Sequence, residues 1–257
     1  MKKVTVFLGS PRKKNTYQIV REFEENLKSY AEIDFEYVFL KDYYLENCKG
    51  CITCFNKGEE CCLIKDDLSL LIDKMNNSDG VIFATPNYSF QVTALMKTFL
   101  DRLGFLFHRP RFFNKAFTAI VVQGIYGGSD IVKYLEFLGR NLGFHVSKGC
   151  CLTALEPRTS LEQQRMTNKI KKASARFYRE LMRPSPNPSF FRLLMFRLGR
   201  TNIKMILDEK FRDYEYYKEK GWFESDYYYE VSLGMIKRLA GRVFDLLGKQ
   251  MVRRRGS

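Results

Sequence analysis

Along the first two-thirds of the chain, short apolar runs alternate with segments in which apolar residues recur every three or four positions. Short apolar runs rich in β-branched residues, a pattern typical of buried strands, occupy residues 4–9, 34–40, 80–86, 117–124 and 145–154. Apolar residues three or four positions apart, the spacing of one helical face, predict helices over Tyr17 to Leu27, Leu68 to Met75, Thr93 to Leu103, Asp130 to Leu142 and Met166 to Phe177. Five strands alternating with helices predict a parallel sheet that has helices on both faces.

Local signals mark where helices start and where the first domain ends. Asp66 or Asp67 is expected to cap the helix that follows, and Ser160–Gln163 fits a capping box. The segment 183–189, "RPSPNPS", has three prolines in seven residues and breaks the last helix. We therefore predict a domain over 1–182, with a cysteine-rich insert at 48–62, and an aromatic and basic extension over 183–257.

The extension is predicted to be mostly helical. In "NPSFFRLLMFRLGR", one helical face carries Phe190, Phe191, Leu194, Met195 and Leu198, whereas Leu193 and Phe196 fall off it. Either the segment 189–204 is a basic interfacial helix that contacts a membrane peripherally, or it packs on the first domain or on a partner subunit. The aromatic and charged segment 213–230 would cover a ligand groove or form an interface.

Glycines recur every seven residues in the last predicted helix, at Gly234, Gly241 and Gly248. Each glycine inside a helix costs about 1 kcal/mol relative to alanine. Their shared face predicts close backbone packing on another helix, for instance in a dimer. The alternative is a shorter helix with three incidental glycines.

Composition and charge narrow the classes of partner. The 257 residues are 45% hydrophobic, which permits a packed core, and carry a net charge of +14. This balance favours anionic partners, but no nucleic-acid-binding module is visible and acidic residues interleave with the basic ones. The apolar run after the basic start is too short for a secretory signal, and no segment is a transmembrane helix. The chain is expected to be cytoplasmic.

The predicted sheet directs attention to three loops. In doubly wound sheets, ligands bind beyond the carboxyl ends of the strands, so the informative loops are 10–16, 86–92 and 123–129. The first, "GSPRKKNT", has neither a Walker A ending nor a GxGxxG fingerprint. Its hydroxyls, its amide, an arginine fork and the free N–H groups of the helix start suit a phosphate. An ordinary βα turn with solvated lysines is the alternative.

Two of these loops resemble a known family. "GSPRKKNT" and "TPNYSFQVTALMKTFLDR", extended by "HRPRFFNKAFTAIVVQGIYGG", are similar to the flavodoxin-fold NAD(P)H-dependent FMN reductases. The cysteine segment followed by Asp66 and Asp67 resembles the iron–sulfur flavoprotein branch. The resemblance covers residues 3–182 and implies a flavodoxin-like, doubly wound, five-stranded parallel sheet. Two departures are a phosphate loop that is one residue shorter, and Ser89-Phe90-Gln91 where the family often has Gly-Ser.

The resemblance also implies a binding site for FMN. Residues that would hold the FMN phosphate are Ser10, Arg12, Asn15 and Thr16. Residues that would line the isoalloxazine are Pro86, Asn87, Tyr88 and Ser89, and those of the opposing loop are Gln123, Gly124, Gly127 and Gly128. A flavin needs a flat apolar wall, a few amide donors and glycine where the backbone approaches the ring, which these residue types supply.

No side chain is assigned as catalytic, because hydride transfer to flavin N5 needs no protein acid or base to start. Asp101 and Arg102 are expected to pair at the end of a helix or at a subunit contact. His145 begins a strand and is expected to be structural, and His108 to serve packing or an interface.

The cysteine segment leaves three alternatives open. Cys48, Cys51, Cys54 and Cys61, with Cys62 as an alternative fourth ligand, have a compact spacing that suits a [4Fe–4S] cluster. Zinc usually prefers two separated CxxC knuckles, and unligated or redox thiols near the flavin are the third alternative. Cys150 and Cys151, on a predicted strand, are expected to be small buried hydrophobes.

The predicted function is an NAD(P)H-dependent FMN oxidoreductase that passes electrons to a small-molecule or protein acceptor, as a homodimer or higher homo-oligomer. One rival is a flavodoxin-type electron carrier, although such carriers are usually acidic. The other is a binding protein that uses the cysteines as a redox or metal sensor.

Overall fold

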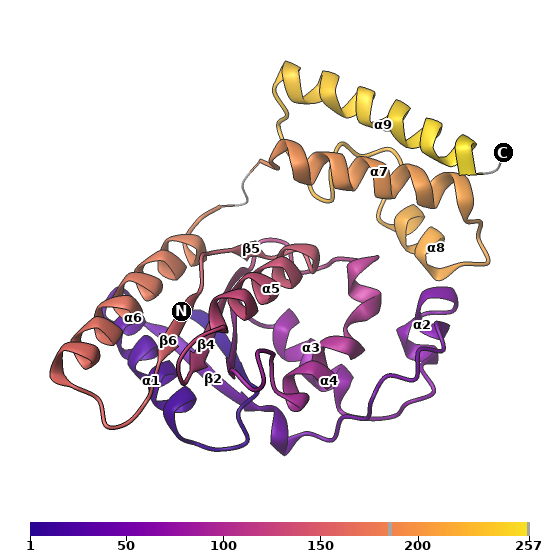
Figure 1. Ribbon diagram of the computed structural model, residues 1–257. Coiled ribbons are helices and arrows are strands. Elements are labelled where there is room, and N and C mark those ends of the chain that lie inside the picture. The colour runs from indigo at the N-terminus through magenta and orange to yellow at the C-terminus, as the bar shows by residue number, and fades with distance from the viewer. Residues whose placement is uncertain (185–186, 256–257) are drawn as a thin grey trace. The chain divides into compact units, whose positions relative to one another are not determined.

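The computed structural model describes residues 1–184 and 187–255, which divide into two units (Figure 1). The first unit comprises Met1–Lys49 and Ile64–Pro184. The second unit comprises Gly50–Leu63 together with the described residues of Ser185–Ser257. The cysteine segment from Gly50 onward therefore groups with the C-terminal extension.

The first unit is built on a parallel sheet with strand order β2-β1-β3-β4-β5. This order, in which the chain reverses its winding direction between β1 and β3, is the flavodoxin-like one, as predicted. The strands are β1 (Lys2–Leu8), β2 (Ile33–Phe39), β3 (Gly80–Pro86), β4 (Ala116–Gln123), β5 (His145–Val146) and β6 (Cys150–Thr153).

The fifth position of the sheet is divided between two segments, β5 and β6, where the sequence predicts one strand. Both pair in parallel with β4, at Ala116–Phe117 and at Ile120–Gln123. Between them, Gly149 donates its N–H to Glu136 at 2.9 Å. A Cβ at Gly149 would lie 2.4 Å from the carbonyl oxygen of Ala119, so only glycine allows the chain to pass this close to β4.

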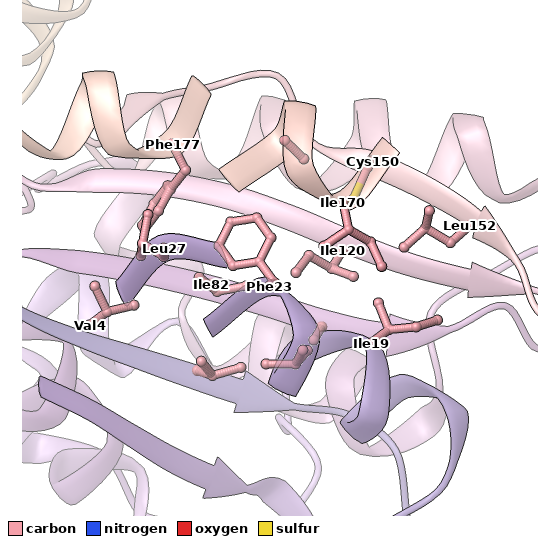
Figure 2. Close-up of a cluster of buried hydrophobic side chains, with 14 of the residues drawn as sticks. Val4, Ile19, Phe23, Leu27, Ile82, Ile120, Cys150, Leu152, Ile170 and Phe177 are labelled. Atoms are coloured by element: carbon pink, nitrogen blue, oxygen red, sulfur yellow. The ribbon is translucent and has the colours of Figure 1, made fainter. Parts of the chain in front are cut away.

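One face of the sheet is covered by α1 (Asn15–Lys28) and α6 (Ser160–Leu181). Alternate strand residues such as Val4, Ile82 and Ile120 point to this face and pack with Phe23 and Phe177 of the two helices (Figure 2). Because β1, β3 and β4 are buried on both faces, their sequences are nearly continuous apolar runs. This explains why the apolar runs in the sequence located these strands well.

The other face of the sheet is aromatic. Phe7 of β1 stacks on Phe99 of α4 (Ala94–Arg102), with ring centroids 5.3 Å apart. Phe83 and Phe117 meet edge to face at 5.0 Å, and the backbone of Gly139 in α5 (Gly128–Asn141) lies against Phe117. The first unit also contains α3 (Leu68–Asn76).

The long helix α6 begins with the predicted type of cap, one residue earlier than expected. Thr159 accepts a hydrogen bond from the N–H of Glu162, and the Glu162 carboxylate accepts one from the N–H of Thr159. The prediction that the box spans Ser160–Gln163 is therefore wrong by one position. Thr159 has the extended backbone that an N-cap needs, whereas Ser160 is already helical.

The second unit contains α2 (Thr53–Asn56), α7 (Phe190–Ile206), α8 (Arg212–Glu219) and α9 (Met235–Arg255). Its core is an aromatic cluster in which Phe196 contacts Tyr228 at 4.5 Å between ring centroids, and Trp222 contacts Tyr217 at 4.9 Å and Tyr228 at 4.8 Å. The indole N–H of Trp222 donates to the carbonyl of Tyr228 at 3.0 Å. The aromatic segment that the sequence singled out thus forms the core of this unit.

Buried charges join α7 to α9. Arg197 bonds Asp226 at 2.5 Å and Asp245 at 2.9 Å, and Arg200 bonds the other Asp245 oxygen at 2.5 Å. Both guanidinium groups are nearly buried. Their terminal nitrogens bond carboxylate or carbonyl oxygens, whereas the buried Arg197 Nε has no hydrogen-bond partner among the described residues. Buried arginines need such partners.

The packing of α7 differs from the face that the pattern picked out. Leu193 and Phe196, which fall off the predicted apolar face, are fully buried, whereas Phe191 and Met195 on that face are 68% and 51% exposed. The prediction followed the longer apolar stripe, but the aromatic and arginine side chains of the core lie on the other side of the helix.

The glycine pattern finds its partner within the chain. A Cβ at Gly241 would lie 3.1 Å from the Arg197 guanidinium, and a Cβ at Gly248 would lie 3.0 Å from Thr201 Cβ. The predicted close packing on another helix is therefore confirmed, with α7 of the same chain as that helix. Gly234 precedes α9 and has nothing within 4 Å of its Cβ position.

Candidate functional site

Three loops of the first unit meet at one edge of the sheet. They follow β1, β3 and β4, which are neighbours in parallel register. Carboxyl ends of parallel strands lie at the same edge, so loops 9–16, 86–92 and 123–128 converge as the sequence predicts. Hydrogen bonds connect the second loop to the third and the first loop to the start of α4.

The first loop presents hydrogen-bond donors and a free helix start. Ser10 is buried, and its hydroxyl bonds the backbone of Arg12, donating to the carbonyl at 2.9 Å and accepting from the N–H at 3.3 Å. This small turn leads into α1, whose first turn has no acidic residue and whose N-cap, Lys14, makes no side-chain cap. The positive end of the helix dipole is thus available to a negative group.

Asn15 and Thr16, at the start of α1, are also part of the packing of the fold. The Asn15 amide donates to the carbonyl of Ala154 at 3.2 Å, which ties the end of the first loop to the chain beyond β6. Thr16 is 4% exposed, whereas Arg12 is exposed. A guanidinium at the rim and hydroxyls inside the turn are a suitable donor set for a phosphate ester.

Thr93 holds the first loop against α4, which sequence reasoning missed. Its hydroxyl donates to the carbonyl of Gly9 at 2.7 Å and accepts from the N–H of Met96 at 3.2 Å. Gly9 itself lies so close to Met96 that a Cβ there would come within 2.9 Å of Met96 Cβ. The preference of threonine for N-caps was the available signal.

The second loop ends β3 in a tight reverse turn. Tyr88 and Gln91 exchange backbone hydrogen bonds of 3.0 and 2.9 Å, and the two residues between them, Ser89 and Phe90, have φ angles of 49° and 62°. Two successive positive φ values define a type I′ turn, which usually takes Asn-Gly. With Ser-Phe at these positions the turn is strained by about 1–2 kcal/mol at each residue.

This strain places an aromatic ring at the edge of the site. Phe90 lies 5.2 Å from Tyr126 of the third loop, between ring centroids, and both rings are largely exposed. The third loop approaches so closely that a Cβ at Gly127, where φ is 90°, would lie 2.5 Å from the Phe90 ring. The departure of Ser89-Phe90-Gln91 from the family pattern therefore produces a paired aromatic wall.

Gln123 organises the third loop. Its amide oxygen accepts from the N–H of Gly128 at 2.7 Å, and its amide nitrogen donates to the carbonyl of Ile125 and the hydroxyl of Thr153. The side chain thus folds back into its own loop. Gly128 lies against Cys151, 2.6 Å from its sulfur at the Cβ position, whereas the Cβ position of Gly124 has nothing within 4 Å.

Asn87 connects the second and third loops and has a buried side-chain oxygen. Its N–H donates to Val122 at 2.7 Å and its side-chain amide donates to the carbonyl of Tyr126 at 2.9 Å. The side-chain oxygen is buried and accepts no hydrogen bond from the described residues. A buried acceptor in this condition calls for a donor from outside the chain, such as the ring N–H of a flavin. The donor set, the aromatic wall and the glycine approaches fit FMN.

Arg102 is structural, as predicted, but its partner is Asp66. The guanidinium makes two hydrogen bonds with the Asp66 carboxylate and a third to the carbonyl of Glu46 at 3.2 Å, and both side chains are almost fully buried. Asp66 and Asp67 also accept the N–H groups of Glu46 and Tyr44 at 3.0 and 2.8 Å. The two aspartates therefore fasten the chain on either side of the cysteine segment.

The other polar residues singled out by sequence lie outside the three loops. Asp101 pairs with Lys97 one turn earlier on the surface of α4. His145 is buried at the start of β5, as expected for a structural residue. His108 follows the short helix η3 (Gly104–Phe107).

The cysteines of the insert are spread along an exposed segment. Cys48, Cys51 and Cys61 are exposed, and Cys54 and Cys62 are half-buried. Nowhere in residues 1–184 and 187–255 do three His, Cys, Asp or Glu side chains come together in a way that could hold a metal ion. In this arrangement the thiols do not fit a cluster or a zinc site. That they lie beside the flavin stays a prediction.

Cys150 and Cys151 have thiols whose pKa is raised by burial. Cys150 is buried in the core, and this burial raises the pKa of its thiol to about 12. Burial also raises the pKa of the half-buried Cys151. A thiol with a raised pKa is neutral and unreactive at pH 7, which confirms Cys150 as a small buried hydrophobe.

Comparison with known proteins agrees with this geometry. A family model described as NADPH-dependent FMN reductase matches residues 2–154. An iron–sulfur flavoprotein of Archaeoglobus fulgidus is 31% identical over 86% of this chain and 99% of its own length. Another from the same organism is 33% identical over 49% of this chain and 61% of its own length. One from Clostridioides difficile is 26% identical over 84% and 94%.

Solved structures share the fold. The structure titled RosB with bound 8-demethyl-8-formylriboflavin-5′-phosphate aligns over 91% of this chain and 92% of its own, with a TM-score of 0.55 and 14% identity. An NAD(P)H:quinone oxidoreductase from Methanothermobacter marburgensis aligns over 67% of this chain and 95% of its own, with a TM-score of 0.53 and 15% identity.

Proposed function

The chain belongs to the NADPH-dependent FMN reductase family, and from this premise we propose that it binds FMN and uses NAD(P)H to reduce an acceptor. The observation that carries the proposal is the convergence of loops 9–16, 86–92 and 123–128 at one sheet edge. FMN supplies the chemistry of accepting a hydride and releasing electrons. The acceptor is proposed to be a small molecule or a protein.

The first loop is proposed to bind the FMN phosphate. Ser10 and Thr16 would offer hydroxyls, Asn15 an amide and Arg12 a cation, while the N–H groups at the start of α1 point to the same place. The uncapped helix start, with no acid in its first turn, supports an anion there because a negative group is stabilised by the helix dipole.

The second and third loops are proposed to hold the isoalloxazine. Backbone and side-chain groups of Pro86, Asn87, Tyr88 and Ser89 would line one edge, with Phe90 and Tyr126 beside them. The buried Asn87 oxygen would accept a hydrogen bond from the ring. Gln123 would act by shaping the loop that contains Gly124, Gly127 and Gly128, since its own amide is already engaged. No side chain is proposed as an acid or base.

Substitution of Arg12 tests the proposed binding of the FMN phosphate directly. In the full-length protein, R12Q is expected to weaken FMN binding by about 10- to 100-fold, because a charge-assisted hydrogen bond contributes roughly 1.5–3 kcal/mol. R21Q, which alters an exposed guanidinium on the following helix α1, should leave FMN affinity unchanged. Titration of apoprotein with FMN, followed by flavin fluorescence, measures both. Equal affinities in the two variants would remove Arg12 from the site.

Turnover separates the proposed enzyme from its rivals. Steady oxidation of NADPH or NADH with a quinone or ferricyanide as acceptor is expected for the enzyme. A flavodoxin-type carrier would bind FMN but show no steady oxidation. A redox- or metal-sensing protein would take up no FMN, and a colourless protein that binds none in titration would refute the proposal.

A second proposal concerns the cysteine segment. The spacing of Cys48, Cys51, Cys54 and Cys61 and the names of the relatives support iron–sulfur binding, for which the loop would have to close around the metal. Iron and sulfide quantified in anaerobically purified protein test this. Flavin bands without iron would leave unligated thiols, and stoichiometric zinc would assign a zinc site.

A further inference from the structure

We propose that the exposed apolar face of helix α9 (Met235–Arg255) binds the surface of a membrane that contains anionic lipids. This inference concerns the second unit and goes beyond the proposed flavin chemistry. It rests on three features of α9, which are an unusually apolar exposed face, an opposite face already in use, and a border that is cationic.

The exposed face of α9 carries an apolar stripe, which only Gln250 interrupts near its C-terminal end. At about 100° per residue its members fall on one side of the helix. Leu239 and Leu246, near its middle, are each 63% exposed. The full stripe consists of Met235, Ile236, Leu239, Val243, Leu246, Leu247 and Met251, all at least 44% exposed. Scattered exposed apolar residues are normal, but a contiguous patch indicates an interaction site.

The opposite face of α9 is occupied within the unit. Gly241 and Gly248 are buried against Arg197 and Thr201 of α7, and Asp245 bonds both Arg197 and Arg200. The two helices lie side by side over their length (Figure 1). The apolar stripe is therefore not the surface that holds α9 in place, and selection for packing on α7 does not account for it.

The charges on α9 identify the partner. The helix contains seven basic residues and one acidic residue, Asp245, and Asp245 lies on the α7 side. Arg238, Arg242 and Lys249 are exposed and border one edge of the stripe at helical spacing. An apolar strip with a cationic border is the form of a helix that lies in the interface of an anionic bilayer. Each such Lys or Arg strengthens binding about fivefold.

Other occupants of the stripe are less consistent with these charges. A second copy of α9 placed antiparallel on the same stripe would bring the two cationic borders together, and like charges oppose such pairing. A parallel copy would gain no ion pair either, because the only acidic residue of α9, Asp245, faces α7. Within the described residues no helix is both long and apolar enough to cross a membrane. The proposed contact is therefore peripheral, with the 21-residue helix, roughly 30 Å long, lying in the plane of the membrane.

The test uses the full-length protein and vesicles of two compositions. One set is pure phosphatidylcholine and the other contains one-quarter phosphatidylglycerol. Flotation at about 0.1 M salt is expected to carry the wild-type protein with the anionic vesicles at least tenfold more than with the neutral ones. The variant L239E/L246E should lose this binding by more than tenfold, and R238Q/R242Q/K249Q should also lose it by more than tenfold.

Matched controls come from the first unit. Leu70 and Leu161 are each 54% exposed, so L70E/L161E adds the same charges at similar exposure. K171Q/K172Q/R179Q removes three exposed charges from α6. Both controls should bind anionic vesicles within about twofold of wild type. Far-ultraviolet circular dichroism and Trp222 fluorescence establish that every variant is folded.

Three results would overturn the proposal. The first is equal flotation with neutral and anionic vesicles, or with none. The second is a dimer in the wild type that L239E/L246E dissociates, which would assign the stripe to a second copy. The third is a lower unfolding midpoint in folded L239E/L246E than in L70E/L161E, which would mean that the stripe is buried within the chain.

Discussion

The two units of this protein bury their side chains in different ways. In the first unit, strands covered on both faces supply a core of aliphatic and phenylalanine side chains, and the buried Arg102–Asp66 pair lies outside this sheet core. In the second unit, the core combines tyrosine and tryptophan rings with buried Arg197 and Arg200, whose hydrogen bonds must be satisfied. The second unit also leaves the apolar stripe of α9 exposed.

This difference has an energetic consequence. Apolar burial contributes about 25 cal/mol for each Å² and is nearly indifferent to its exact partners. Buried charges contribute little net stability when paired, but cost several kcal/mol when a partner is removed. The sheet core of the first unit should therefore tolerate conservative substitutions, whereas the core of the second unit, like the Arg102–Asp66 pair of the first, should depend on single carboxylates. Four measurements break or sharpen this contrast.

The largest effect is expected from a buried ion pair in the first unit. R102M leaves the Asp66 carboxylate, with a side chain only 1% exposed, without its cation. Its free energy of unfolding should fall by about 3–5 kcal/mol, measured by urea denaturation followed by circular dichroism. K97M removes the exposed partner of Asp101 on the same helix and should change it by at most about 0.5 kcal/mol. Similar losses in both variants would contradict the assignment.

The next effect tests the second unit by itself. D245N removes the charge shared by Arg197 and Arg200 and should cost about 2–3 kcal/mol. Trp222 is the only tryptophan of the chain, so its fluorescence reports unfolding of this unit alone. E224Q, at an exposed ion pair with Lys204, is the control and should leave the transition in place. A transition equally unmoved in D245N would show that the network is not essential.

A smaller effect is expected at the flavin site. G127A places a side chain at a φ of 90° and 2.5 Å from the Phe90 ring, so the second and third loops must separate. FMN affinity should fall about tenfold, in line with about 1–2 kcal/mol of backbone strain. G124A, in the same loop with nothing within 4 Å, should bind FMN as the wild type does. If G127A bound FMN normally, the third loop would not contact the flavin.

The smallest effect is a pH dependence of the first unit. Burial alone would raise the pKa of Glu36, but hydrogen bonds from Lys3 and Lys74 outweigh it and hold the pKa below its ordinary value. The carboxylate therefore stabilises the fold above about pH 4.3, its unfolded value, and this stability is lost as the pH falls through the lower folded pKa. E36Q should be about 1 kcal/mol less stable at pH 7.

The pH profile gives the control for Glu36. Because the glutamine cannot titrate, the wild-type and E36Q stability curves should converge at acidic pH. A difference that stayed constant from pH 7 to pH 3 would mean that packing, rather than charge, explains the loss.

Much of the first unit could be predicted because its signals are local. A strand buried on both faces must be apolar throughout, so β1, β3 and β4 appear in the sequence almost as they are in the structure. The order of strands and helices then fixes which loops share an edge. Residues such as Thr93 and Asn87 escaped full assignment because their partners, Gly9 and Tyr126, are distant in sequence.

The amino-acid sequence by itself determined the parallel sheet, the three loops at its carboxyl edge and the glycine face of α9, since each depends on residue type at a regular spacing. Only the tertiary structure decided the partners. It set Arg102 on Asp66, paired α9 with α7 of the same chain, buried Leu193 and Phe196 instead of the longer apolar face and, within the described residues, brought no three cysteines together as ligands of a metal. The physical reason is that periodicity records how apolar a face is, whereas burial depends on which face meets other parts of the folded chain.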